Sequence, residues 1–304
     1  MTPDKYLDKI LKPQTFADDA PELKEVRQRR KDIEVSLRKH FPKSGPSIRW
    51  GGSMVKNTMI RESYDGDLSC YFPADEKEAG STLEEIYNSV ATALSKDYDV
   101  ERKTSALRVK DRSTKATKGF AVDLHIDVVP GRYTDDDEED VYIHQEAGTK
   151  ERLKTNLQVH IDHIKDSGLT DTIRLTKLWN CQNGIGAKTF VLELLTVKLL
   201  AKKKSLGLSE QLKHVWTQFR DHTDELAVED PANPTGNDLK PALDAVRASL
   251  ASVARTTLSA IDKPGWESVF GKIQEEEAAE DRKAALRAAA VHVASPTRPW
   301  CARG

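Results

Sequence analysis

The chain has 304 residues, with 47 lysines and arginines against 49 aspartates and glutamates, so its formal net charge is −2 at pH 7. No stretch approaches the roughly 20 apolar residues of a membrane span, and residues 1–10 lack the apolar core of a signal peptide. Three widely spaced cysteines, Cys70, Cys181 and Cys301, argue against a disulfide framework or a zinc site. We expect a cytoplasmic protein without a membrane segment, and the near-neutral charge argues against a coat on long nucleic acid.

The first half of the chain mixes helix and strand signals. An apolar stripe predicts a helix from Leu23 to Phe41, and Ser81 as N-cap with Glu84 predicts a second helix over Ser81–Leu94. Pro130-Gly131 predicts a turn, followed by a solvated acidic loop over Thr134–Asp140. Strands are predicted over Ser47–Trp50, Leu68–Phe72, Asp99–Val109 and Gly119–Val129.

The second half is almost entirely helical in pattern. Helices are predicted over Leu157–Ile164, Asp171–Asn180, Phe190–Lys203, Ser209–Phe219, Leu239–Ile261 and Glu267–Ala290. The layout predicts an α+β protein with two domains, an N-terminal mixed domain over 1–150 and a helical domain over 151–294, followed by a mobile tail over 295–304. A site is expected in the cleft between the two domains.

The stretch from Trp50 to Phe72 carries the clearest chemical signal. A Gly51-Gly52-Ser53 turn follows a strand, which lets backbone N–H groups and the Ser53 hydroxyl approach a phosphate. Asp65 and Asp67 open the next strand and project from the same face, about 6.5–7 Å apart along the backbone. Carboxylates this close repel each other unless a cation lies between them, and Mg²⁺ fits oxygen ligands.

A third carboxylate strengthens the evidence that this pair binds a metal ion. In Gly119–Val129, alternate apolar residues lie on one face, and Asp123, His125 and Asp127 lie on the other. Asp123 would lie about 13 Å from Asp127 along the strand, too far to share a metal. We therefore select Asp127, whereas Asp123 fits the wet face of an ordinary strand. For His125, a solvent-facing or hydrogen-bonded histidine is favoured over a catalytic base.

Three carboxylates on two neighbouring strands can hold two Mg²⁺ ions about 4 Å apart, with Mn²⁺ as an alternative ion. One ion would lower the pKa of an attacking hydroxyl, and the other would bind the triphosphate and stabilise the leaving pyrophosphate. The pattern predicts Asp65, Asp67 and Asp127 as the catalytic metal ligands of a phosphoryl-transfer site.

These motifs resemble the polymerase-β-like nucleotidyltransferase superfamily, and within it the bacterial cGAS/DncV-like nucleotidyltransferases and the oligoadenylate synthases. The resemblance covers roughly residues 45–270 and implies a palm, a mixed sheet with flanking helices, plus a C-terminal helical domain. It is carried by Gly52-Ser53, Asp65-x-Asp67, Asp127–Pro130, Lys177–Asn180, Lys188–Glu193 and the loop Asp230–Asn237.

The resemblance implies further nucleotide-binding residues. Ser53 would contact the triphosphate, Lys177 would neutralise phosphate charge, Thr189 would hydrogen-bond a phosphate, and Phe190 would stack on the donor base. Each has a plainer interpretation, since Lys177 can be a solvated helix lysine and Phe190 a core residue. Glu193 is assigned no chemistry and is expected to pair with a basic residue.

Two residues depart from the family pattern. Gly66 stands between the aspartates where the family usually has an apolar residue, and a glycine weakens a strand. Asn57 stands before Thr58 where a glycine is common. These departures motivate one alternative, a catalytically silent nucleotide-binding scaffold.

The resemblance implies an enzyme that joins NTPs, ATP first, into a cyclic or short linear oligonucleotide for antiphage defence. The product, and not the protein, would bind the downstream effector. A rival interpretation is transfer to an RNA, DNA or protein hydroxyl, as in CCA-adding or primer-dependent enzymes. The compact basic clusters over 27–31 and 202–204 would be its polynucleotide track, although solvated helix faces explain them as well. A C-terminal Gly304 raises a weaker hypothesis, conjugation by a ubiquitin-transfer-like partner. Base choice, linkage and activating signal are left open.

Overall fold

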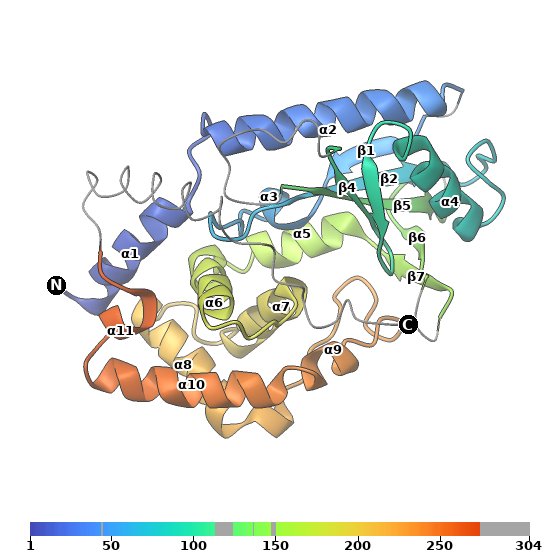
Figure 1. The fold of residues 1–304 in the computed structure, drawn as a ribbon. Helices are drawn as coiled ribbons and strands as arrows, with labels where there is room; N and C mark the ends of the chain where they lie inside the picture. The colour runs from blue at the N-terminus through green and yellow to red at the C-terminus, as the bar shows by residue number, and fades with distance from the viewer. Residues whose placement is uncertain (44, 113–123, 136, 147–149, 274–304) are drawn as a thin grey trace.

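A seven-stranded mixed sheet forms the N-terminal half of the computed structural model, which describes residues 1–43, 45–112, 124–135, 137–146 and 150–273. The strand order is β1-β2-β5-β4-β3, with β6 on β5 and β7 on β6 (Figure 1). Only β2 and β5 run parallel among these pairs. The strands are β1 Ser47–Trp50, β2 Gly66–Phe72, β3 Asp99–Arg102, β4 Leu107–Lys110, β5 Ile126–Tyr133, β6 Val141–His144 and β7 Arg152–Thr155.

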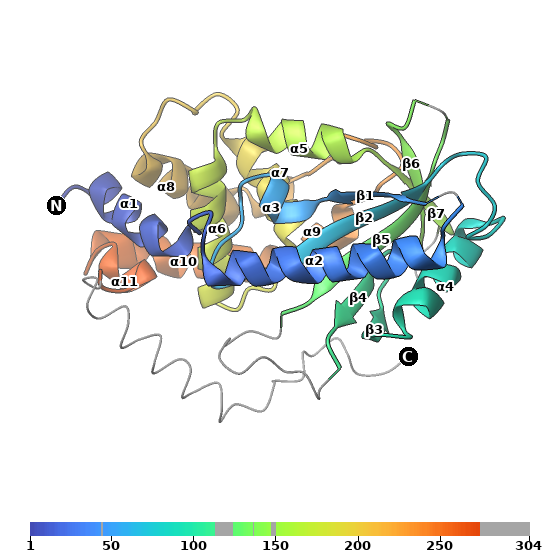
Figure 2. The same ribbon diagram turned by 90° about the horizontal axis from the view of Figure 1, so that it is seen from above.

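Helices cover the two faces of this sheet differently. Helix α2 crosses one face, and the C-terminal helices gather on the other side (Figures 1 and 2). The longer helices are α1 Pro3–Gln14, α2 Pro21–His40, α4 Leu83–Leu94, α5 Leu157–Lys165, α6 Thr170–Gln182, α7 Thr189–Leu199, α8 Leu208–Asp221 and α10 Arg247–Asp262. The short ones are α3 Gly52–Val55, η2 Thr223–Glu225, α9 Lys240–Asp244 and α11 Glu267–Phe270.

The core beneath α2 and α4 follows from the alternation of the strands. Leu68 and Phe72 of β2 and Ile126 and Val128 of β5 are buried against the apolar stripe of α2, which confirms the predicted helix after Pro21. The N-cap of α4 lies one residue later than predicted. It is Thr82, whose hydroxyl accepts from the backbone N–H of Glu85 while the Glu85 carboxylate accepts from the backbone N–H of Thr82, a capping box.

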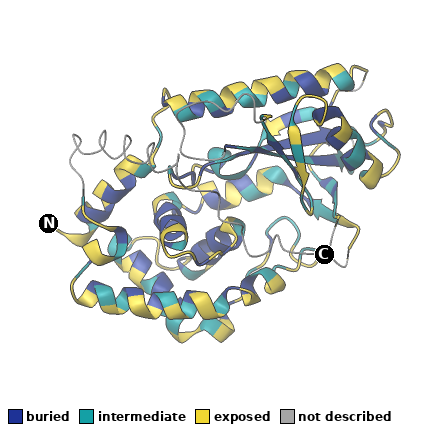
Figure 3. Ribbon diagram, viewed as in Figure 1, coloured by how far each residue is buried: buried dark blue, intermediate teal, exposed yellow. Residues whose placement is uncertain are grey.

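A second core lies within the helical half. Trp179 of α6 and Trp216 of α8 are fully buried, with ring centroids 5.6 Å apart. The indole N–H of Trp179 donates to the Thr257 hydroxyl at 2.8 Å, so its polar group is satisfied. Helices α6 and α7 are buried along most of their length, whereas α2 and α10 alternate between buried and exposed residues (Figure 3).

Helix α1 was not predicted, and it packs with this second core. Tyr6, Leu7 and Ile10 contact the helical half, and the hydroxyl of Tyr6 donates to the carbonyl of Gly271. The domain limits at 150 and 294 stay a prediction, as does the tail, which lies outside the described residues. Within the part of the chain that the structure describes, no helix is long and apolar enough to cross a membrane.

Several predicted elements differ from the structure. The strand predicted over Asp99–Val109 is the hairpin of β3 and β4, because the chain turns between Arg102 and Leu107. The turn predicted at Pro130-Gly131 is wrong, since both residues pair with β2 as β5 continues to Tyr133. A Cβ on Gly131 would lie 2.6 Å from the Val141 side chain, so the glycine leaves room for β6 beside β5.

In the helical half, three predicted limits differ. Helix α7 ends at Leu199 instead of Lys203, and the helix predicted over Leu239–Ile261 divides into α9 and α10. Of the helix predicted over Glu267–Ala290, α11 covers the first four residues, and the part after 273 lies outside the described residues. Strands β6 and β7 had no sequence signal that we recognised.

Candidate metal and nucleotide site

The pairing of β2 with β5 brings the predicted carboxylates together. Asp67 lies directly beside Asp127 in the parallel register, and the backbone N–H of Gly66 donates to the carbonyl of His125 at 3.3 Å. Asp65 and His125 directly precede β2 and β5, and Asp67 and Asp127 lie within these strands, so all four residues are on the face away from α2. This two-by-two array is called the acidic array below.

The turn before α3 is fitted closely to Asp67. The N–H of Gly51 donates to the backbone carbonyl of Asp67 at 2.7 Å, which holds the turn on β2. Gly52 has a φ of +58°, and a Cβ on it would lie 1.6 Å from Oδ2 of Asp67. Only glycine fits here, because the left-handed backbone and the close approach both exclude a side chain. The predicted roles of Gly52 and Ser53 toward a phosphate stay predictions.

The charges of the array change its acid–base behaviour. Burial, together with the neighbouring carboxylates of Asp65 and Asp127, raises the pKa of Asp67 to about 7. Burial also opposes ionisation of Asp65, but His125, Lys177 and Arg108 outweigh it, and the pKa of Asp65 is lowered. Near neutral pH the carboxylates of the array therefore carry more negative charge than His125 offsets. Such an excess of negative charge favours a bound cation.

One ligand atom each from Asp65, His125 and Asp127 lies within 4.8 Å of the others. The donor set of carboxylates and imidazole fits the divalent ion that the sequence analysis predicts. The predicted trio was Asp65, Asp67 and Asp127. The group in the structure contains His125, which the sequence interpretation had set aside, in place of Asp67, whose predicted role as a metal ligand stays a prediction.

Arg108 holds the third carboxylate in place. Its Nε and Nη2 each donate to an oxygen of Asp127 at 3.0 Å, from the opposite register position on β4. Such a bidentate pair fixes the plane of the carboxylate. The sequence interpretation missed Arg108, because its position opposite Asp127 depends on the β3–β4 hairpin that was read as one strand.

A second charged group lies where the sheet meets the helical half. Lys56 donates to Glu193 at 2.7 Å, the hydroxyl of Thr58 donates to the same carboxylate at 2.7 Å, and Lys177 donates to the carbonyl of Thr58 at 2.9 Å. The Nζ of Lys177 lies 3.7 Å from Glu193. All four residues are buried. We call them the Glu193 cluster, and they confirm that Glu193 pairs with basic residues.

Lys177 is thus a buried lysine and not the solvated helix lysine of the plainer interpretation. Only 3% of the residue is exposed, and burial lowers its pKa. Its positive charge still acts on the acidic array, where it lowers the pKa of Asp65 and opposes the rise at Asp67. Contact between Lys177 and a phosphate stays a prediction.

Thr189 and Phe190 open helix α7 at the edge of the Glu193 cluster. Thr189 is exposed and Phe190 is half-buried. The ammonium of Lys56 lies 5.2 Å from the centroid of the Phe190 ring, and the ring of His160 lies 4.9 Å from it. The Phe190 ring is therefore held by a cation and an imidazole, and its predicted stacking on a base stays a prediction.

Hydrogen bonds hold the loop that follows Asp230 beside the rings of His160 and Phe190. The buried Asp230 pairs with His160 Nε2 at 2.6 Å and accepts from Asn237 at 2.7 Å. The side chain of Asn233 donates to the carbonyl of Lys154 at 2.9 Å. Asp230, Asn233 and Asn237 of the family-like loop therefore serve to fix it against α5 and β7.

Both departures from the family pattern have structural reasons. A Cβ on Gly66 would lie 2.3 Å from the terminal methyl of Ile126 and 3.2 Å from the Trp50 ring, so the glycine leaves room for these two side chains. Asn57 has a φ of +59°, a conformation that asparagine tolerates better than most residues. Its side chain also accepts from Arg174 at 2.6 Å. The catalytically silent scaffold that these departures motivated stays an alternative prediction.

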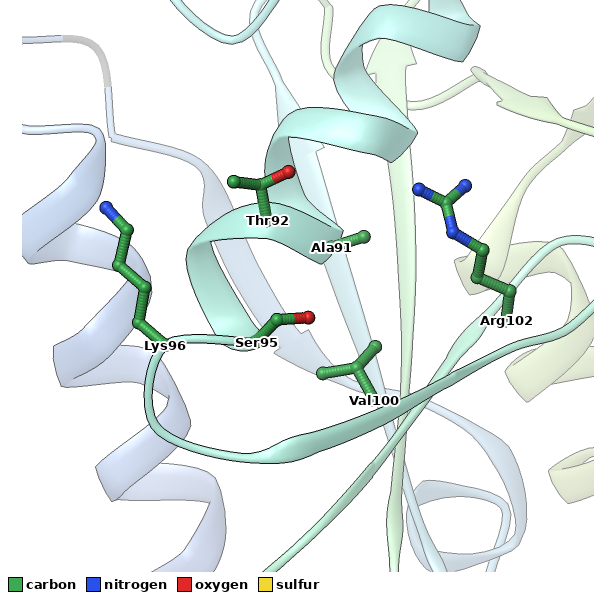
Figure 4. Close-up of a pocket in the computed structure, with 6 residues that line it drawn as sticks. All are labelled: Ala91, Thr92, Ser95, Lys96, Val100 and Arg102. Atoms are coloured by element: carbon green, nitrogen blue, oxygen red, sulfur yellow. The ribbon is translucent and has the colours of Figure 1, made fainter.

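Two cavities lie away from the array. One of about 460 Å³ lies between α4 and β3 and is lined by residues that include Thr92, Ser95 and Arg102 (Figure 4). Another of about 580 Å³ is lined by residues of the sheet, the loop before β6 and α5. Neither contains a predicted site residue. Asp123 and Gly304 lie outside the described residues.

Several solved structures of bacterial proteins have a similar fold. Vibrio cholerae DncV cyclic AMP-GMP synthase matches 90% of this chain over 97% of its own, with 15% identity and a TM-score of 0.67. Escherichia coli MS115-1 CdnC with ATP matches 90% of this chain over 98% of its own, with 18% identity and a TM-score of 0.63. Bradyrhizobium diazoefficiens CdnG with GTP matches 94% of this chain over 99% of its own, with 13% identity and a TM-score of 0.66. No protein-family profile and no curated protein sequence matches. The predicted palm with a C-terminal helical part is confirmed at the level of the fold.

Proposed function

We propose that this protein is a metal-dependent nucleotidyltransferase that joins nucleoside triphosphates into a cyclic or short linear oligonucleotide. The acidic array carries the proposal, because β2 and β5 align three carboxylates beside a turn whose glycine leaves room for one of them. The similar folds belong to proteins whose structures contain ATP or GTP, or that make cyclic AMP-GMP. That likeness alone does not fix the acceptor.

In the proposed reaction, a hydroxyl oxygen of one nucleotide bonds to the α-phosphorus of another. The bond to the bridging oxygen breaks, and pyrophosphate and one proton leave. Asp65, Asp67 and Asp127 would hold divalent ions. When bound, such ions lower the pKa of a hydroxyl and offset phosphate charge. The Gly51–Ser53 turn would orient the triphosphate, and the Phe190 ring would support a base.

The product class supports a role in signalling. We propose that the oligonucleotide is a second messenger for antiphage defence and that it, and not this protein, binds the effector. NTP substrates place such an enzyme in the cytoplasm. Transfer to RNA is less favoured, because Arg27, Arg29 and Arg30 of α2 each pair with a carboxylate instead of forming an open basic track.

Labelled NTPs with Mg²⁺ or Mn²⁺ test the proposal. We expect pyrophosphate release and an oligonucleotide product without added acceptor, identified by mass spectrometry. Asp65→Asn and Asp127→Asn should lower the rate by at least about 100-fold, since each removes a ligand charge. Asp75→Asn, an exposed carboxylate after β2, is the matched control and should retain the rate. Absence of product with every NTP mixture would contradict the proposal, and strict dependence on added RNA would favour the rival acceptor.

A further inference from the structure

The acidic array contains a nitrogen donor in addition to its carboxylates. Nε2 of His125 lies 3.5 Å from Oδ2 of Asp65 and 3.9 Å from Oδ1 of Asp127. The side chains of His125 and Asp127 are 12% and 17% exposed, whereas that of Asp65 is 39% exposed. His125 therefore occupies the buried side of the group, and Asp65 occupies the more exposed side.

These separations suit ligands of one ion. With bonds of about 2.0–2.2 Å, two donors on the same ion lie about 3.0 to 4.3 Å apart, depending on the angle between them. Both distances from His125 fall in that interval. The whole trio lies within 4.8 Å, so a small movement of the more exposed Asp65 completes the site.

Arg108 does not compete for the same lone pairs. A carboxylate has about four acceptor positions on its two oxygens, and Arg108 uses one on each oxygen of Asp127. One position per oxygen remains for an ion. The guanidinium instead holds Asp127 in a fixed orientation beside His125, as groups behind a metal ligand commonly do.

The donor set determines which ion is preferred. Mg²⁺ binds oxygen ligands almost exclusively, whereas first-row transition metals bind imidazole readily. We propose that Asp65, His125 and Asp127 form a mixed nitrogen and oxygen site that binds a transition metal, represented by Mn²⁺, in preference to Mg²⁺. The inference deepens the proposed function, on which the catalytic role of this ion rests.

Mn²⁺ binding to the nucleotide-free protein tests the inference without any activity measurement. Electron paramagnetic resonance should show Mn²⁺ bound with an affinity at least about tenfold above that for Mg²⁺ in competition. Pulsed resonance should show coupling to ¹⁴N, and labelling the protein with ¹⁵N-histidine should replace that coupling by ¹⁵N. The labelled wild-type protein provides this result even where a variant folds poorly.

Variants then assign the nitrogen. His125→Asn should abolish the nitrogen coupling and reduce the preference for Mn²⁺ over Mg²⁺ by about tenfold, because an oxygen donor replaces the imidazole. His222→Asn, at the end of α8 and half-exposed, is the matched control and should retain both. Mn²⁺ bound without histidine coupling, or an unchanged preference in His125→Asn, would overturn the inference.

The result separates the inference from the proposed function. Nitrogen coupling in a protein that makes no product would leave the metal site standing and remove the proposed reaction. Product formation with Mg²⁺, without nitrogen coupling to Mn²⁺, would leave the reaction standing and remove the mixed site.

Discussion

The protein contains two clusters of charged residues that differ in how their charges are compensated. In the Glu193 cluster, two lysines and a threonine surround one buried carboxylate, and the described contacts use its two oxygens. In the acidic array, three carboxylates face one arginine and one histidine, and the side chain of Asp65 is 39% exposed. The first cluster is complete in itself and joins the loop after α3 to helices α6 and α7. The second leaves negative charge that a cation would satisfy.

This difference separates structural charges from binding charges. A compensated buried group is expected to act on stability, and an uncompensated half-open group on ligand binding. Substitutions in each cluster can therefore confirm or refute the assignment, because the readouts are independent.

Removal of Glu193 is expected to have the largest effect on stability. Glu193→Ala leaves Lys56 and Lys177 as buried cations without their carboxylate, which should lower the free energy of unfolding by about 3–5 kcal/mol. Urea denaturation measures the loss. Glu210→Ala, exposed on α8, serves as control. A change below about 1 kcal/mol would show that the cluster is not structural.

Gly52→Ala should act mainly on activity. The added Cβ collides with the carboxylate of Asp67, so that ligand must move, and displacement of about 1 Å at a reacting centre costs on the order of 100-fold in rate. The left-handed backbone adds about 1–2 kcal/mol of destabilisation. Pyrophosphate release and urea denaturation measure the two effects. Gly186→Ala, also at positive φ but in open space, should show only the second.

Asn57, which lies between Lys56 and Thr58 of the Glu193 cluster, offers a smaller test. Asn57→Ala should lower the free energy of unfolding by about 1–2 kcal/mol, through the positive φ and the loss of the bond from Arg174. Asn57→Gly removes the bond from Arg174, but glycine adopts the positive φ without strain. Its loss of unfolding free energy should therefore be about half as large. Equal losses in urea denaturation would argue against a backbone role for this residue.

The pH dependence of stability tests the charge excess of the array. The folded-state pKa of Asp67 is about 7, above its unfolded value of about 3.9. The folded protein then binds more protons between these values, so the unfolding free energy of the metal-free protein falls as pH rises from about 4 to 7. Asp67→Asn should remove this contribution, whereas Asp75→Asn should leave it. Urea denaturation in a chelator at pH 5 and pH 8 measures the difference.

Local patterns were sufficient for much of the fold. The stripe of α2, the alternation around Asp127 and most C-terminal helices follow from side-chain periodicity, which acts within one element. The predictions failed where pairing between elements decides the outcome. Pro130 normally disfavours a strand interior, yet β5 continues through it between β2 and β6.

The sequence by itself determined the catalytic candidates, because paired carboxylates beside a glycine turn carry a chemical meaning without coordinates. It also indicated that the first half mixes helices and strands, whereas the second half is almost entirely helical. Only the tertiary structure decided which residues surround those candidates. Arg108 and His125 acquire their roles from strand register, and Lys56 and Glu193 from the packing of α7 against the loop after α3. Such contacts join residues up to 137 positions apart, and no local periodicity encodes them.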